Sequence, residues 1–335
     1  MIKLSVLDQS PIRAGGAHQD AVNETLELAK AADRLGYHRY WVAEHHNSGG
    51  LACTAPEILI SRIASITEKL RVGSGGVMLS HYSPLKVAET FRMLETLFPG
   101  RIDLGIGRAP GTDRQTASAL RPASDGWGAE QFPDQVADVI SFINDQIDSQ
   151  HPHASVHALP AGPTCPPIWL LGSSGQSAAL AAHFGCAFSF AHFINHRGGP
   201  AVMQAYRERF RPSSELTTPA GSIGVFVLCA ETDAEAQRLC ASRDLWRLRV
   251  DQGNMGPFPS IEEALAYPYS DTERAQVTVN QQRQVVGSPD RVRDELMQLC
   301  DLYGVDELVV LTICYDFAPR LRSYELLAEA FSVSS

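Results

Sequence analysis

The sequence predicts an α/β protein that folds as one (β/α)₈ TIM barrel with insertion loops at its C-terminal face. Short apolar runs of strand length alternate along the chain with segments whose apolar residues recur at helical spacing. The chain has 335 residues, 44% of them hydrophobic, which suffices for a barrel of about 250 residues with insertions. We therefore expect a single domain over residues 1–335.

Four predicted βα units account for roughly the first third of the chain. Their strands are the apolar runs at residues 2–7, 39–43, 70–79 and 102–106, the third of which is interrupted by glycines. Helical spacing follows the first three, at residues 20–35, 56–67 and 84–97. Gly36 and Gly100 stand where the first and third of these helices end.

The second half of the chain keeps the same alternation. Its strand-length runs are residues 168–171, 187–191, 223–229 and 308–313, with helical patterns such as 233–250 and 319–331. Eight apolar strands that alternate with helices favour a closed parallel barrel over an open sheet. Two long irregular stretches, residues 109–132 and 251–288, are interpreted as lids or binding loops, with partial disorder as the alternative.

Composition excludes several classes of partner. The formal net charge is -10, with both signs mixed along the chain, so we expect no nucleic-acid binding. Seven scattered cysteines without a C-x-x-C pair indicate reduced thiols and a cytoplasmic protein. The N-terminus does not resemble a secretory signal, and no stretch reaches the roughly 18 apolar residues that cross a membrane.

Function in a barrel of this kind belongs at the C-terminal ends of the strands. The second predicted strand ends in Glu44, His45 and His46, where a histidine beside a carboxylate is suited to proton transfer. An ordinary polar surface loop is the alternative. Metal binding is a third interpretation, but the chain lacks an H-E-x-x-H helix and an H-x-H on its first strand, so we predict no metal.

A glycine and serine run stands between the fifth strand and its helix, where unpaired amides and the helix dipole favour a phosphate. It comprises Gly172, Ser173, Ser174 and Gly175. Arg108, which follows the fourth strand, has the counter-charge for such a group. A serine-capped turn and a solvated arginine are the plain alternatives.

Two adjacent glycines, Gly75 and Gly76, interrupt the third strand directly after Ser74. Glycine weakens a strand, so either a packing bulge or the close approach of a flat ligand explains the pair. A separate dinucleotide-binding domain is not predicted, because in the run from Gly105 to Pro110 a proline replaces the third glycine of G-x-G-x-x-G. A G-x-S-x-G nucleophile elbow is absent from the sequence.

Taken in order and spacing, these motifs resemble the bacterial luciferase-like monooxygenase family. The resemblance rests on residues 40–47, 71–79, 83–89 and 98–111, and residues 167–174 and 286–289 extend it over most of the chain. It implies a flavin enzyme that takes reduced FMN from a separate flavin reductase and uses O₂, through a C4a-hydroperoxyflavin, to oxidise a small organic substrate. It also implies a homodimer, packed through helices of the early βα units.

The resemblance assigns roles residue by residue. His45 is the implied catalytic group, and the Gly75–Gly76 link falls where the family has a non-prolyl cis peptide that faces the flavin. The implied cofactor-binding positions are Glu44, Ser74, Gly75, Gly76, Arg108, Gly172, Ser173, Ser174 and Gly175. His192 and Phe193 are interpreted as substrate residues, although His192 as a strand cap is an open alternative.

The chain departs from the light-emitting members of that family. Gly107 stands where those enzymes have a cysteine, and residues 191–195 differ from their aromatic-rich segment, so light emission and long-chain aldehydes are not expected. Two other functions stay open: a deazaflavin (F420)-dependent hydride-transfer oxidoreductase and a non-catalytic flavin-binding protein. The variable loops that select a substrate carry no readable signal.

Overall fold

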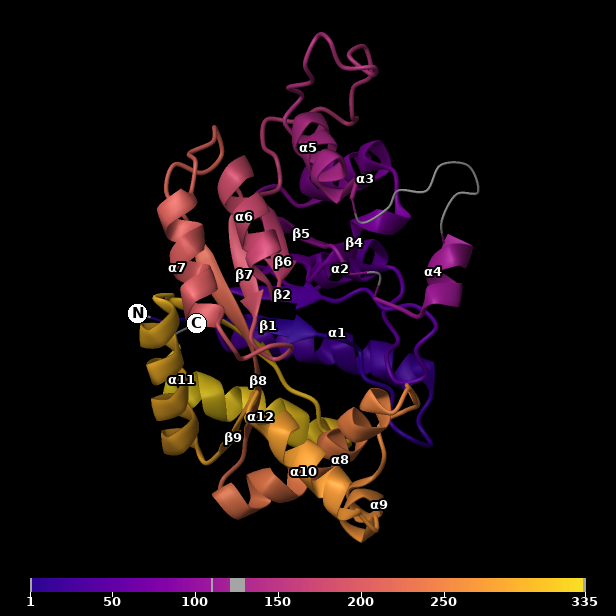
Figure 1. Ribbon diagram of the computed structural model, residues 1–335, viewed down its shortest axis with the longest axis vertical. Coiled ribbons are helices and arrows are strands. Elements are labelled where there is room, and N and C mark those ends of the chain that lie inside the picture. Colours follow the sequence, from indigo (N-terminus) through magenta and orange to yellow (C-terminus); the bar gives the residue numbers. More distant parts are fainter. Residues whose placement is uncertain (1, 110, 121–129, 334–335) are drawn as a thin grey trace.

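The computed structural model describes residues 2–109, 111–120 and 130–333, and within them eight parallel strands close into a barrel (Figure 1). In order around the ring the strands are β1 (Lys3–Asp8), β2 (Arg39–Val42), β3 (Arg71–Ser74), β5 (Ile102–Gly107), β6 (Ile168–Gly172), β7 (Ala187–Ala191), β8 (Gly221–Cys229) and β10 (Glu307–Leu311). β10 closes the ring because it pairs with both β8 and β1. The predicted fold class is confirmed, and all eight predicted runs are strands.

Helices surround the ring and pack on its outer face. They are α1 (His18–Arg34), α2 (Pro56–Ser65), α3 (Pro84–Leu97), α5 (Phe132–Ile143), α6 (Gly175–Phe184), α7 (Gly199–Arg209), α11 (Pro289–Tyr303) and α12 (Phe317–Ala330). Outward-facing strand residues such as Val6 and Val72 share one buried cluster with helix residues such as Leu28 and Phe91. This burial of apolar area is the main force that holds the helices to the barrel.

The third barrel strand breaks at the glycine pair, as its sequence predicted. β3 ends at Ser74, and after Gly75 and Gly76 the short strand β4 (Val77–Met78) pairs again with β5. The 3₁₀ turn η1 (Leu79–His81) then leads into α3. The break brings bare backbone to the C-terminal end of the barrel.

The expectation that residues 251–288 are irregular is wrong. After α8 (Asp233–Asp251) this segment forms α9 (Ile261–Ala266), α10 (Asp271–Gln281) and β9 (Gln284–Gly287), and β9 pairs with the far end of β8 (Figure 1). α9 and α10 are short and mostly exposed, so they lack the apolar periodicity that identifies a helix in a sequence. Each begins at a serine cap: the side chains of Ser260 and Ser270 each accept a hydrogen bond from a backbone amide of the first turn.

This insertion lies over the loops that follow β1 and β2. The amide of Phe258 donates to the carbonyl of Ile12 at 2.8 Å, and the amide of Ala14 donates to the carbonyl of Phe258 at 2.7 Å. Both partners of Phe258 belong to the loop at the C-terminal end of β1, so the insertion lies at that end of the barrel. In the other stretch predicted to be irregular, α4 (Arg114–Leu120) forms, whereas residues 110 and 121–129 lie outside the described residues.

The opposite end of the barrel interior holds a layer of buried charges. Arg39 donates to Asp103 at 2.6 Å and to Glu307 at 2.5 and 3.1 Å. Its guanidinium lies 4.7 Å from the ring centroid of Trp169, so it is stacked as well as paired. None of the helices in the described ranges is both long and apolar enough to cross a membrane.

Candidate functional site

A cavity of ≈ 250 Å³ opens at the C-terminal ends of the barrel strands. Seven of the residues predicted from the sequence line it: Gly75, Gly76, Arg108, Gly172, Ser173, Ser174 and Phe193. They come from four separate strand ends, so the fold assembles one site from segments that lie far apart in the sequence. This is the end at which barrels of this kind carry their chemistry.

The glycine pair presents bare backbone to the cavity. The peptide between Gly75 and Gly76 is cis. A Cβ at Gly75 would lie 2.5 Å from Leu7 Cδ1, and one at Gly76 would lie 2.7 Å from the carbonyl oxygen of Gly105. A side chain is therefore excluded by backbone at Gly76 and would require Leu7 to shift at Gly75, and the cavity wall consists of bare backbone here.

The start of α6 also contributes to the cavity lining, through Gly172, Ser173 and Ser174. Ser174 is the N-cap of this helix, and its side chain makes no cap hydrogen bond to a described residue. Arg108 reaches this turn from the end of β5 and donates to the side-chain oxygen of Gln176. The helix-terminal amides and the guanidinium together suit a phosphate.

Glu44 is fully buried and connects three parts of the site wall. Its Oε1 accepts a hydrogen bond of 2.6 Å from the hydroxyl of Tyr82 and lies 2.6 Å from Nε2 of His46. Its Oε2 accepts a hydrogen bond of 2.9 Å from the backbone amide of Met78. Met78 lines the cavity. Burial and the adjacent Glu44 carboxylate raise the pKa of Tyr82, which therefore stays a donor.

His45 lies in the loop after β2 and is not among the residues that line the cavity. Its amide donates to the carbonyl of Cys53 at 2.9 Å, and its ring nitrogen Nδ1 is buried with no hydrogen-bond partner among the described residues. Burial, with a smaller contribution from the nearby His46, lowers the pKa of His45 to about 4. The imidazole is consequently neutral at neutral pH and is able to accept or donate one proton.

Five of the predicted residues do not line the cavity: Glu44, His45, Ser74, Gly175 and His192. Ser74 Oγ is fully buried and bonds both the carbonyl and the amide of Gly105, at 2.8 and 3.0 Å, so it ties β3 to β5. His192 is buried, and its Nδ1 lies 2.8 Å from the hydroxyl of Tyr303 on α11. Among the described residues, neither Ser74 nor His192 contributes to the cavity lining, whereas Phe193 does.

Reasoning from the sequence missed the apolar walls of the cavity. They include Leu7, Trp41, Met78, Leu171, Ile194 and Val309. Strands buried on both faces carry apolar residues at every position, so their sequence does not tell which face lies inside the barrel. One signal was available: Ser189 is the only polar residue in the strand Ala187–Ala191, and it lines the cavity.

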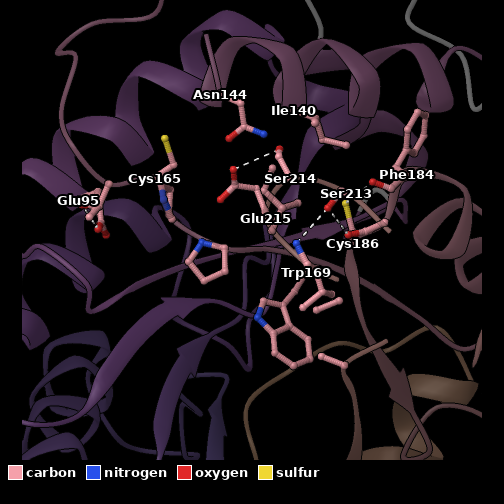
Figure 2. Close-up of a pocket in the computed structure, with 18 of the residues that line it drawn as sticks. Glu95, Ile140, Asn144, Cys165, Trp169, Phe184, Cys186, Ser213, Ser214 and Glu215 are labelled. Atoms are coloured by element: carbon pink, nitrogen blue, oxygen red, sulfur yellow. Dashed lines mark hydrogen bonds between the residues drawn. The ribbon is translucent and has the colours of Figure 1, made fainter. Parts of the chain in front are cut away.

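A larger cavity of ≈ 630 Å³ lies at the other end of the barrel (Figure 2). Its lining includes Arg39, Ile168 and Ala187, which begin β2, β6 and β7. The residues predicted to be functional all lie elsewhere. Within the parts of the chain that the structure describes, no group of three or more His, Cys, Asp or Glu side chains is arranged to hold a metal ion.

The fold and the site define a barrel whose C-terminal cavity has a wall of glycine backbone and, at the start of α6, a helix N-terminus with an arginine beside it. The family model described as luciferase-like monooxygenase matches residues 2–306. The chain therefore belongs to the luciferase-like monooxygenase family, and it is an enzyme of that family.

Individual relatives match over nearly the full length. The uncharacterized protein YceB of Bacillus subtilis (strain 168) is 46% identical over 333 residues, covering 99% of this chain and 100% of that protein. An N-acetyl-S-alkylcysteine monooxygenase of the same strain is 38% identical over 335 residues, covering 98% of each chain. The crystal structure of apo-MsnO8 has a TM-score of 0.92 at 43% identity and covers 100% of this chain and 99% of its own.

More distant structures share the fold alone. The oxygenating constituent of 3,6-diketocamphane monooxygenase from Pseudomonas putida, in complex with FMN, has a TM-score of 0.71 at 22% identity over 98% of each chain. An F420-dependent secondary alcohol dehydrogenase has the same TM-score at 12% identity and covers 100% of this chain and 99% of its own. This fold is thus found with either a flavin or F420.

Proposed function

We propose that this protein is an FMN-dependent monooxygenase, which takes reduced FMN from a separate reductase and uses O₂ to oxidise a small organic substrate. The observation that carries the proposal is the cavity itself, in which the backbone wall at Gly75–Gly76 and the start of α6 with Arg108 beside it face one space. In the net reaction one oxygen atom enters the substrate, and the other leaves as water with the two electrons and protons of the reduced flavin.

The residues of the cavity fit FMN at both of its ends. A planar ring system packs against backbone that carries no Cβ, which is the role of Gly75 and Gly76. The phosphate is held by Arg108, by the first amides of α6 and by the hydroxyls of Ser173 and Ser174, with Gly172 and Gly175 in the same turn. When bound, reduced FMN supplies the two electrons that activate O₂.

Two further roles belong to the end of β2. His45, neutral and with Nδ1 unpaired among described residues, is the residue we assign to proton transfer during oxygenation. Glu44 acts on the cofactor through Met78, whose backbone it holds in the cavity wall. Ser74 contributes by fixing the strand that carries the glycine pair. Light emission is not part of this proposal.

The experiment that tests the cofactor compares FMN with riboflavin, which lacks the phosphate. We expect Arg108→Gln to weaken FMN binding roughly tenfold or more, the size of a lost charge-assisted contact, and to leave riboflavin binding unchanged. Equal weakening of both flavins would place the phosphate elsewhere.

A second experiment separates this function from the F420 alternative, which the F420-dependent structural neighbour keeps open. Purified protein is titrated anaerobically with reduced FMN and then mixed with oxygenated buffer. Free reduced FMN also consumes oxygen, so the readout is the rate and spectral course of flavin reoxidation compared with the same mixture without protein. A reoxidation course that the protein changes supports the monooxygenase. Failure to bind reduced FMN, together with binding of F420, would favour hydride transfer, and flavin binding that leaves the reoxidation course unchanged would favour a flavin-binding protein.

The proposed partners follow from the same assignment. The related enzyme that contains FMN is an oxygenating constituent, which supports a separate reductase here.

A homodimer through α2 and α3 is supported by a groove of ≈ 660 Å³ on the surface of these helices. Its lining includes the exposed side chains of Ile58, Met93, Leu97 and Leu159. We expect Leu97→Glu to shift the mass in solution to that of a monomer. All seven cysteines are free, which supports a reducing, cytoplasmic environment.

A further inference from the structure

We infer that Arg243, on the insertion helix α8, binds the carboxylate of a small organic acid that enters the barrel mouth. The inference rests on the proposed function, since it names the class of substrate that the flavin site oxidises. It concerns the side of the ring formed by β8, three strands away from the β5 end that carries Arg108.

Arg243 lies directly above the inner face of the barrel. Gly224 of β8 lines the cavity, and Phe226, two residues further along the strand, points to the same side. Phe226 shares one buried cluster with Leu7 and Val309, which both line the cavity. The guanidinium carbon of Arg243 lies 4.4 Å from the ring centroid of Phe226. The charged group therefore lies on the inner side of β8, next to a residue that packs with the cavity-lining Leu7 and Val309, although Arg243 itself does not line the cavity.

The charge of Arg243 is poorly compensated by the chain. Its side chain is only 7% exposed, and its Nη1 is buried without a hydrogen-bond partner in the described part of the protein. The neighbouring Asp244 has its Oδ1 3.7 Å from Nη1, too far for a hydrogen bond. Both oxygens of Asp244 instead accept 2.7 Å hydrogen bonds, one from Gln281 and one from Gln284. A buried cation with an unpaired donor is costly, and an anion at this position removes the cost.

Two more arginines extend this cationic patch toward the cavity. Arg247, one turn further along α8, has its Nε buried without a partner among described residues. Arg283 donates to the carbonyl of Ile194 at 2.9 Å, and Ile194 lines the cavity. Burial is the main cause that lowers the pKa of Arg243 and of Arg283. The nearby charge of Arg247 lowers both pKa values further. Three arginines thus stand against two carboxylates, those of Asp244 and Asp251.

The chemistry of the ligand follows from these surroundings. A guanidinium binds a carboxylate through two parallel hydrogen bonds, and Arg243 offers a planar group already fixed over an aromatic ring. The walls of the cavity include the apolar side chains of Leu171, Phe193 and Val309. The fitting substrate is a small acid whose carboxylate binds at Arg243 and whose apolar part, the part that is oxidised, reaches the flavin wall.

The test measures binding in the absence of flavin, so that it does not depend on turnover. Hexanoate and its uncharged counterpart hexanamide are titrated into the purified full-length protein by calorimetry. We expect hexanoate to bind about tenfold or more tightly than hexanamide, because only the carboxylate pairs with a charged donor. Arg243→Gln should abolish this preference, and Arg243→Lys, which keeps the charge but not the planar fork, should retain part of it.

Two control variants make the result specific. Arg238, on the same helix, is exposed and pairs with Glu235, so Arg238→Gln should leave the preference for hexanoate unchanged. Arg108→Gln should also leave it unchanged, because a carboxylate bound at the start of α6 is the competing site. Equal binding of the two probes, no binding of either, a preference that survives in a folded Arg243→Gln variant, or one that disappears in Arg108→Gln would each overturn the proposal. Retained FMN binding by Arg243→Gln separates this failure from failure of the proposed function.

Discussion

The hydroxyl of Tyr82 donates a 2.6 Å hydrogen bond to the carboxylate of Glu44, although α2 and β3 separate the two residues along the chain. The same carboxylate holds the amide of Met78, which lines the cavity. A buried acid therefore fixes the cavity wall on the side of β4 without lining the cavity itself. Its contribution is measurable as stability and as flavin affinity.

Replacing Glu44 by Gln should destabilise the protein by about 2–3 kcal/mol, because the amide nitrogen of glutamine must face at least one buried donor. The loss should appear as a lower urea midpoint with an unchanged slope. Tyr82→Phe, which removes a single neutral donor, should cost less, about 1 kcal/mol. If Glu44→Gln unfolds at the same urea concentration as the parent, the carboxylate is not the centre of this network.

Replacing Gly76 by Ala should destabilise the protein by about 1–3 kcal/mol and weaken FMN binding, because the new methyl group has no space. Its nearest neighbours are the backbone oxygen and carbon of Gly105, at 2.7 and 2.9 Å, which are unable to move aside as a flexible side chain does. Gly162→Ala is the matched control, since the nearest atom there is 3.8 Å away. Equal urea midpoints for the two variants would contradict the assigned contact.

Much of this architecture is predictable from the sequence because it follows from local patterns. A short run of consecutive residues is enough to predict each of these features: the eight strands, the glycine break before Val77, and the glycine and serine turn before α6. The insertion at residues 251–288 is different. Its helices are too short and too exposed to show apolar periodicity, although Ser270 and Glu273 form a capping box that marks the start of α10.

The long-range polar contacts were not predictable in the same way. Asp103 and Glu307 stand within or beside apolar runs, and only the closed ring brings both to Arg39. The pairing of His192 with Tyr303, 111 residues later in the chain, likewise depends on where α11 packs. Spacing in a sequence carries no information on such contacts, because tertiary packing alone brings the partners together.

Asp103→Asn should cost about 3 kcal/mol or more, because a buried ion pair that loses one partner leaves the other charge uncompensated. Asp103 accepts hydrogen bonds from Arg39 at 2.6 Å, from Arg71 at 2.6 Å and from the indole nitrogen of Trp41 at 3.1 Å. The measurement is the free energy of unfolding in urea. Asp294→Asn, at an exposed position, is the control and should change it little. A small effect at Asp103 would mean that the layer relaxes around the loss.

Stability should fall as the pH drops from about 6.5 to about 4, in part because of His192. Burial, with a smaller contribution from His196, lowers the pKa of His192 from 6.5 to about 4. Between these values the unfolded chain binds the proton and the folded chain does not, so acid favours unfolding by at most about 3 kcal/mol for this residue. His192→Asn should lose less stability over that interval, whereas replacement of the exposed His153 by Asn should match the parent. A parallel pH dependence in both variants would exclude His192 as a source of acid sensitivity.

His45→Ala should abolish substrate oxygenation and leave FMN affinity within twofold of the parent, because we assign proton transfer to the imidazole and phosphate binding to other residues. With its pKa lowered to about 4 by burial, His45 stays neutral at neutral pH. The parent should therefore show no ionisation of this group in a kcat profile between about pH 5 and pH 9. His45→Gln, which keeps a hydrogen-bonding side chain but has no titratable nitrogen, should stay inactive if proton transfer is the role. Recovery of turnover by His45→Gln would instead make His45 a hydrogen-bonding residue that positions the flavin or the substrate.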